Sequence, residues 1–179
     1  DAPHSRMIAT GSSTSPNSLR NPPAMRPLDR IDRVILARLQ NNARTSNKEI
    51  AAAVGLAPST ALERTRRLEA DGVLVGYHAE VSAEALGVGL QALVAVTLRQ
   101  HARPLVEAFE AHALGLPEVV QVFHTAGAAD FLVHVAVRDT EHLRTLALAG
   151  FTERPEVARI ETSLLFAHRR TAGLPIADA

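Results

Sequence analysis

The side chains in this 179-residue sequence that could do catalytic or metal chemistry are mainly its eight histidines, because cysteine is absent. The lack of cysteine excludes disulfides, zinc–cysteine sites and thiol catalysis. The histidines form no HxH, HxxxH or HExxH group, so we predict no catalytic residue, no metal site and no cofactor. One alternative is a two-histidine site, since His124 and His134 fall on neighbouring strands of a predicted hairpin and could face each other.

A second kind of chemistry is suggested by basic and hydroxyl side chains between residues 44 and 67. They are Arg44, Lys48, Ser59, Thr60, Glu63, Arg64, Arg66 and Arg67. Small hydroxyls followed by arginines on one helix suit the phosphates and base edges of double-stranded DNA. We expect Ser59 and Thr60 to meet phosphates or base edges, Arg64 and Arg67 to reach guanine or the backbone, and the two earlier basic residues to contact phosphates.

Two helices must come before the one that carries these arginines. Apolar residues at three- and four-residue steps from Leu28 to Leu39 predict a first helix, which ends near residues 41–42. The Asp29 and Asp32 carboxylates suit the positive end of that helix. A second helix is predicted to begin at Ser46, since Glu49 three residues later completes a capping box.

The third helix follows a short break at residues 55–57. Pro58 suits its first turn, and Gly72 ends it after Asp71. Its apolar side is predicted to hold residues 61, 62, 65 and 68, opposite the polar residues named above. A short β-like run over 73–78 then completes the order of a winged helix-turn-helix, which we place at residues 28–78. An ordinary small helical bundle is the alternative.

Composition restricts the remaining classes of function. Residues 28–78 carry eight Lys and Arg against six Asp and Glu, whereas 79–170 carry eight against eleven, which fits a DNA-binding module joined to a different one. Aromatic residues are only 3%, which disfavours readers of single-stranded nucleic acid. No run of about 18 apolar residues predicts a membrane span, and no signal pattern opens the chain. We therefore expect a cytoplasmic, nucleoid-associated protein.

The second module is predicted at residues 90–170, after a flexible N-terminal tail (1–27), the first module and a hinge (79–89); residues 171–179 form a C-terminal tail. Its expected strands are 90–98, 119–125, 131–137 and 157–166, and its helices are 103–113 and 140–150, the latter capped by Thr140. This β-α-β-β-α-β order is ferredoxin-like, so the fold class of the chain is α+β. Two helices cover one sheet face, and we expect a second subunit to cover the other, because the strands are rich in valine and carry few charges.

Three segments give the sequence a family resemblance: LDRIDR at 28–33, VGLAPS at 54–59 and LERTRRLE at 62–69. Together they resemble the leucine-responsive, or Lrp/AsnC, family of feast/famine regulators over about residues 28–170. The resemblance implies a winged helix domain joined to a ferredoxin-like effector domain. It also implies dimers that assemble into octamers and respond to amino acids.

The resemblance also implies an effector loop, which in the family typically reads Gly-Asp-Phe-Asp-Tyr. The matching residues here are Gly127, Ala128, Ala129, Asp130 and Phe131, so one acid and one aromatic residue are replaced by alanines. Asp130 is the candidate contact for the ammonium of an amino acid, and amides beside Gly127 for its carboxylate. An equal alternative is that Asp130 is a turn residue that bonds backbone. The alanines predict a roomier and less acidic site, suited to a large apolar or aromatic amino acid, or else weak and promiscuous binding.

A rival interpretation comes from another class of protein. Ferredoxin-like dimers also occur as small oxygenases and as amino-acid-sensing domains of enzymes. In that case residues 1–78 would be an accessory helical module. The arginines at 64, 66 and 67 favour a DNA-binding regulator, because an enzyme has no use for three such side chains on one exposed side.

Overall fold

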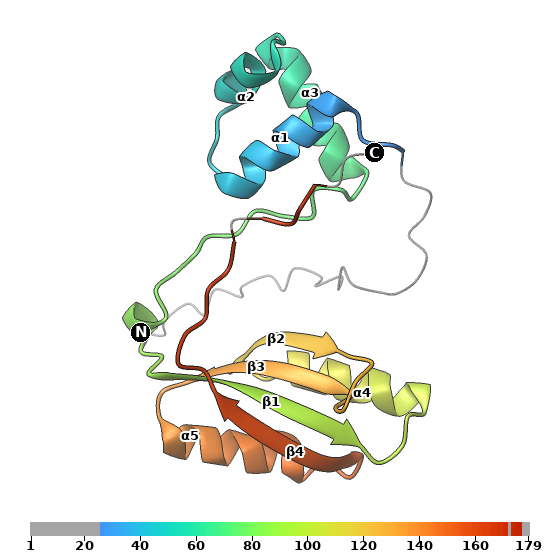
Figure 1. Ribbon diagram of the computed structural model, residues 1–179, viewed down its shortest axis with the longest axis vertical. Coiled ribbons are helices and arrows are strands. Elements are labelled where there is room, and N and C mark those ends of the chain that lie inside the picture. Colours follow the sequence, from blue (N-terminus) through green and yellow to red (C-terminus); the bar gives the residue numbers. More distant parts are fainter. Residues whose placement is uncertain (1–25, 172, 177–179) are drawn as a thin grey trace, which may run out of the picture. The chain divides into compact units, whose positions relative to one another are not determined.

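The computed structural model describes residues 26–171 and 173–176, and these fold into two compact units (Figure 1). Unit 1 consists of Asp1–His78 and Thr171–Ala179, and unit 2 is Ala79–Arg170. The predicted N-terminal tail lies outside the described residues, apart from its last two positions.

Unit 1 is built on three helices: α1 (Arg30–Asn41), α2 (Asn47–Val54) and α3 (Pro58–Ala70). Capping boxes start the first two, with Asp29 and Ser46 as the N-caps, and the predicted start of α2 is thereby confirmed. Gly55 ends α2 in the left-handed region at φ 69°, a conformation that glycine adopts without steric cost. These three helices are the predicted helix-turn-helix.

The core of unit 1 is small and apolar. Ile35, Ile50, Ala61 and Leu68 are among its buried members, so each helix contributes to it. The C-terminal segment also belongs to it, because Ile176 packs against the same cluster. The side-chain amide of Gln40 accepts the backbone N–H of Leu174 at 2.6 Å and donates to its carbonyl at 3.4 Å.

The strand predicted at 73–78 is not formed; within the described part of unit 1 the segment is irregular. A lone strand has no ladder partner for its amides and carbonyls, so the β pattern of these residues cannot be expressed without another strand. The segment is tied to α3 instead, through a 2.8 Å hydrogen bond from the Tyr77 hydroxyl to Glu69. Burial and this bond raise the pKa of Tyr77 to about 12.

Unit 2 has the predicted ferredoxin-like order. Its elements are a short turn η1 (Glu84–Leu86), β1 (Leu90–Leu98), α4 (Arg103–Leu114), β2 (Val119–His124), β3 (Phe131–Val137), α5 (Thr140–Thr145), a π-helical continuation η2 (Leu146–Thr152) and β4 (Val157–Leu164). All strand pairs are antiparallel, in the order β2-β3-β1-β4. Helix α4 and the continuous helical segment formed by α5 and η2 lie on the same side of the sheet (Figure 1).

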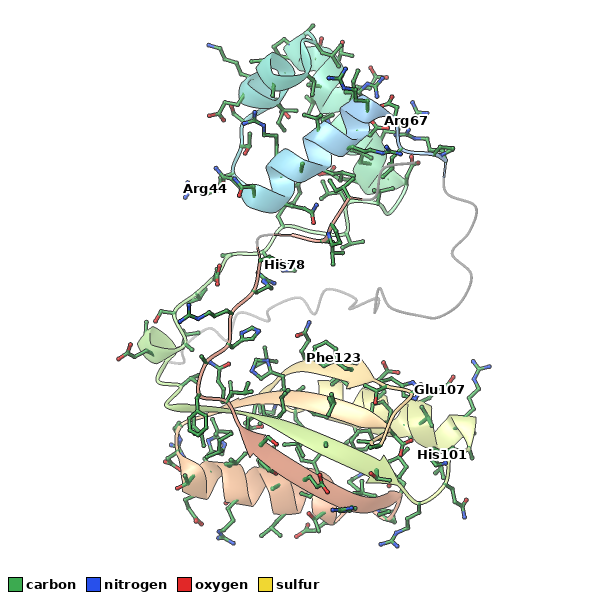
Figure 2. The ribbon with its side chains drawn as sticks, viewed as in Figure 1. Arg44, Arg67, His78, His101, Glu107 and Phe123 are labelled. Atoms are coloured by element: carbon green, nitrogen blue, oxygen red, sulfur yellow. The ribbon has the colours of Figure 1, made fainter. Side chains whose placement is uncertain are left out.

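Alternation along the strands explains why only one face of the sheet is covered. On β1 and β3 every second residue is fully or almost fully buried, and these residues pack against Phe109 of α4 and Phe151 of η2. The residues between them form the opposite side, here called the open face. It includes Leu93, Leu132 and the 43% exposed Phe123, which projects from β2 away from α5 (Figure 2).

One local prediction in unit 2 is wrong, and one alternative is excluded. The N-cap of α5 is Asp139 rather than Thr140, since the Asp139 carboxylate accepts the backbone N–H of His142 at 2.8 Å. The two-histidine site is absent, because the register pairs His124 with Phe131 on the helix side, whereas His134 lies on the open face. The His134 ring bonds Gln91 at 2.8 Å, so it is a satisfied polar side chain of the sheet.

Candidate nucleic-acid interface and effector pocket

One side of α3 is polar and exposed, as the sequence predicts. Ala61, Thr65 and Leu68 are buried against the other helices. The predicted contact residues around them are exposed, with the exception of Arg64; these are Arg44, Lys48, Ser59, Thr60, Glu63, Arg66 and Arg67. Figure 2 shows Arg44 and Arg67 at the surface of unit 1. The helix thus presents hydroxyls on its first turn and guanidinium groups on its third.

The N-terminus of α3 differs from those of the other two helices in this unit. Side chains cap α1 and α2, but the N-cap of α3 is Ala57, which makes no side-chain bond. Pro58 at the first position removes one amide, and the next amides are open. Open amides at a helix N-terminus attract phosphate oxygens, helped by the helix dipole. Ser59 and Thr60 lie beside these amides.

Arg64 lies differently from the other arginines of α3. Its Nη1 donates to Asp29 Oδ2 at 2.6 Å and to Asp32 Oδ1 at 3.0 Å, and its side chain is 29% exposed. The hydrogen bond from Arg64 lowers the pKa of Asp29 below its ordinary value. The side chain is therefore engaged with the start of α1, a contact that sequence reasoning did not foresee. The three- and four-residue spacing of Arg64 from buried Ala61 and Leu68 could have indicated that it lies beside the buried side of α3, but not which residues it contacts.

The loop between β2 and β3 borders a cavity of about 450 Å³ in unit 2. Of the predicted effector residues, Gly127, Ala128 and Ala129 line it. The rest of the lining was not foreseen and comes from the open face and the strand ends: Ala95, Thr97, Thr125, Leu132, Arg159 and Glu161. The cavity offers two hydroxyls and one pair of opposite charges among apolar surfaces.

Asp130 and Phe131, the other two predicted effector residues, face elsewhere. Phe131 is fully buried in the core, with its ring centroid 4.8 Å from that of Phe109. The Asp130 carboxylate accepts the backbone N–H of Leu98 at 2.7 Å, and its other oxygen lies 2.8 Å from Nε2 of His101 in the loop before α4 (Figure 2). Asp130 thus joins the β2–β3 loop to the end of β1.

Arg159 and Glu161 are the charged side chains of the cavity. Both lie on the open face of β4, two residues apart, and they form an ion pair with each other. Their register partners on β1 are Thr97 and Ala95, which places them across from the cavity's hydroxyl and apolar lining. The alternation of β4 could have placed both on one face, but only the pairing of β4 with β1 brings them beside a loop from residues 125–129.

Two further features concern residues 26–171 and 173–176. No group of three or more histidine and acidic side chains is placed to hold a metal ion there. None of the helices in the same residues is long and apolar enough to cross a bilayer.

An exposed basic recognition helix and a separate ferredoxin-like unit with a ligand-sized cavity define a DNA-binding transcription regulator with its own ligand-binding domain. Comparison with known families agrees: residues 28–69 match the AsnC-type helix-turn-helix domain, and residues 91–171 match the Lrp/AsnC ligand-binding domain. The chain belongs to the Lrp/AsnC family of transcriptional regulators.

Individual relatives support the same assignment. The chain is 44% identical over 147 residues to the HTH-type transcriptional regulator AldR of Mycolicibacterium smegmatis, covering 82% of this chain and 86% of that one. It is 40% identical over 119 residues to the leucine-responsive regulatory protein of Salmonella typhimurium, covering 66% and 73%. A transcriptional regulator of Neisseria meningitidis, solved in complex with L-Met, is similar in structure, with a TM-score of 0.77, 31% identity and 83% and 97% coverage.

Proposed function

We propose that this regulator binds double-stranded DNA through the uncapped start and the exposed side of α3, and that an amino acid in the β2–β3 cavity modulates the binding. The observation that carries the first half is the side of α3 that presents Ser59, Thr60, Arg66 and Arg67 with Glu63 between them. Arg44 and Lys48, both exposed, supply phosphate contacts beside it. The rival enzyme interpretation is not favoured, since the relatives named above are regulators.

Binding-site selection on random DNA with the full chain tests this half. We expect one preferred sequence with two half-sites, because a dimer repeats the contacts about one helical turn apart. Arg67→Gln should weaken binding to every sequence and reduce the slope of log K against log salt by about 0.9, the value for one phosphate contact. Selection that returns no preferred sequence would contradict the proposal.

The second half rests on the shape and charge of the cavity. A volume of about 450 Å³ is within the range of small-molecule sites. An amino acid carries one carboxylate and one ammonium. Arg159 can bind the carboxylate and Glu161 the ammonium, in place of the ion pair that the two side chains form with each other. Ala128 and Ala129 leave room for its side chain, which favours a large apolar or aromatic one. The similar Neisseria meningitidis regulator was solved with L-Met.

Thermal-shift measurements with each of the twenty amino acids test the effector. A ligand that binds only the folded chain at a hundred times its Kd stabilises it by about 2.7 kcal/mol. We expect such a shift from a subset of apolar amino acids, and its loss in Glu161→Gln and Arg159→Gln. A conservative control is Glu153→Gln, an exposed acid of unit 2 outside the cavity. No shift with any amino acid would reject this half alone.

We also propose that the open face of unit 2 is the assembly surface, and that its first product is a dimer from which octamers can form. Phe123, Leu93 and Leu132 expose apolar surface there, which a second copy would remove from water. The cavity lies at one end of this face, so a ligand in it can bias the assembly. Light scattering of the full chain should show a dimer or larger, and Phe123→Glu should reduce the assembly.

A further inference from the structure

We propose that Arg64 positions the recognition helix and does not contact DNA, as part of a five-residue ionic cluster that fixes α3 against the start of α1. The members of the ionic cluster are Arg26, Asp29, Asp32, Arg64 and Asp71. The inference goes beyond the proposed DNA contacts, because residues that do not touch DNA would set the orientation of α3 relative to α1.

Asp32 is the centre of the ionic cluster, and both of its oxygens are occupied by arginines. Its side chain has no exposed surface. Oδ1 accepts from Arg64 at 3.0 Å, and Oδ2 accepts from Arg26 Nη1 at 2.7 Å. A buried carboxylate is costly unless it is both paired and hydrogen-bonded. Each arginine therefore compensates one side of a charge that cannot reach water.

The same arrangement opposes any movement of Arg64 toward DNA. If the guanidinium turned outward, it would leave Asp29 as well as one oxygen of Asp32. The loss of one partner from a buried ion pair is strongly unfavourable, because the remaining charge stays desolvated. Arg66 and Arg67 form no ion pair among the described residues, and both are exposed. The arginines of α3 thus divide into one that is retained by the protein and two that are available to DNA.

The ionic cluster holds α3 at two separated points. Arg64 binds the start of α1 from the second turn of α3. Asp71, the C-cap of α3, accepts from Arg26 Nε at 3.1 Å, and Arg26 in turn binds Asp32. Two attachments about two helical turns apart fix the tilt of a helix, whereas one would allow it to pivot. The tilt decides which side chains of α3 reach the groove together.

Asp29→Asn is the sharpest test, because charge and positioning predict opposite results. Asparagine is as good an N-cap as aspartate, so α1 keeps its cap while Arg64 loses its closest partner. Removal of a negative charge from a DNA-binding surface should by itself strengthen binding. If the ionic cluster positions α3, the full-length Asp29→Asn protein should instead bind its selected site on the order of tenfold more weakly, equivalent to about 1.4 kcal/mol. Glu69→Gln, which removes an exposed charge from α3 outside the proposed DNA contacts, should not weaken binding in this way.

Arg64→Gln, with Arg67→Gln as the matched comparison, tests whether Arg64 contacts DNA. A positioning role predicts that Arg64→Gln weakens specific binding across the whole site while the salt slope on nonspecific DNA stays unchanged. A phosphate contact would lower that slope by about 0.9, as expected for Arg67→Gln. A base contact would relax preference at one base pair only.

Either of the last two results, or tighter binding by Asp29→Asn, would overturn the proposal. Circular dichroism checks that each variant is folded. If Arg64→Gln unfolds unit 1, the result with Asp29→Asn, which keeps its helix cap, decides the question alone.

Discussion

Replacement of Asp130 should separate the two roles that its sequence position allows, an effector contact and a contact to the protein's own backbone. The Asp130 carboxylate accepts the backbone N–H of Leu98 at 2.7 Å and lies 2.8 Å from the ring of His101. We expect Asp130→Ala to destabilise unit 2 even without ligand, and to leave the stabilisation by an amino acid in place.

The magnitude follows from the two contacts. A hydrogen bond to a charged acceptor contributes about 1.5–3 kcal/mol when it is largely shielded, and the Asp130 side chain is only 15% exposed. The His101 side chain is 70% exposed, so that pair adds about 0–1 kcal/mol. Asp130→Ala should therefore cost about 2 kcal/mol, or on the order of 10 °C in the Tm of a unit of this size. Asp130→Asn should cost less, because its amide oxygen can still accept from Leu98.

Scanning calorimetry of the full chain, with and without the most stabilising amino acid, measures both quantities. We expect the destabilisation to increase from His101→Ala through Asp130→Asn to Asp130→Ala. The ligand-induced shift in Tm should be similar in all three variants. The reasoning is refuted if Asp130→Asn keeps the Tm of the unliganded protein but abolishes the shift. That result would make Asp130 the ammonium contact.

Three further outcomes are expected. Burial and the nearby His168 lower the pKa of His134, so the folded state favours the neutral form of its ring. The unfolding free energy of unit 2 should therefore fall as the pH drops below about 6.5, where the ring is protonated more readily in the unfolded chain. Calorimetry from pH 7.5 to 5 should show a smaller fall in His134→Gln. Ile176→Ala should lower the unfolding free energy of unit 1 by about 1 kcal/mol, because the Ile176 side chain is only partly buried against the core. Urea unfolding measures this change, and an unchanged unfolding midpoint would mean that the C-terminal segment does not pack there. Leu132→Glu should reduce assembly in light scattering, whereas an unchanged mass would exclude the open face as the interface.

The sequence predicted most elements of this fold because their local signals agree with their tertiary environment. The capping box at Ser46, the glycine after α2 and the alternation along β1 each specify a start, an end or a face within a few residues. The segment 73–78 has β-like residues but no partner strand, so its local preference is not realised. At α5, two adjacent residues could both cap the helix, and the pattern could not choose between Asp139 and Thr140.

The sites were predicted less completely, because they depend on contacts between distant residues. An amphipathic pattern identifies the polar side of α3, but it cannot show that Arg64 is bound by acids 32 and 35 residues earlier. The effector loop was identified by its resemblance, whereas Arg159 and Glu161 join it only through the pairing of β4 with β1. The sequence left Asp130 equally open as an ammonium contact and as a turn residue that bonds backbone, and only the fold shows that its carboxylate accepts the distant backbone N–H of Leu98.

The return of the C-terminal segment to unit 1 has a consequence for how the protein is made. Gln40 and Leu174 are 134 residues apart, so this contact in unit 1 cannot form until residue 174 has been synthesised. Unit 2 shortens that search, because the pairing of Ala92 with Leu164 brings its two ends together and removes about half of the intervening loop. Each halving of a loop lowers the entropic cost of closure by about 0.6 kcal/mol. Prior folding of the effector domain would therefore lower the entropic cost of the final closure of the DNA-binding domain, although it follows that domain along the chain.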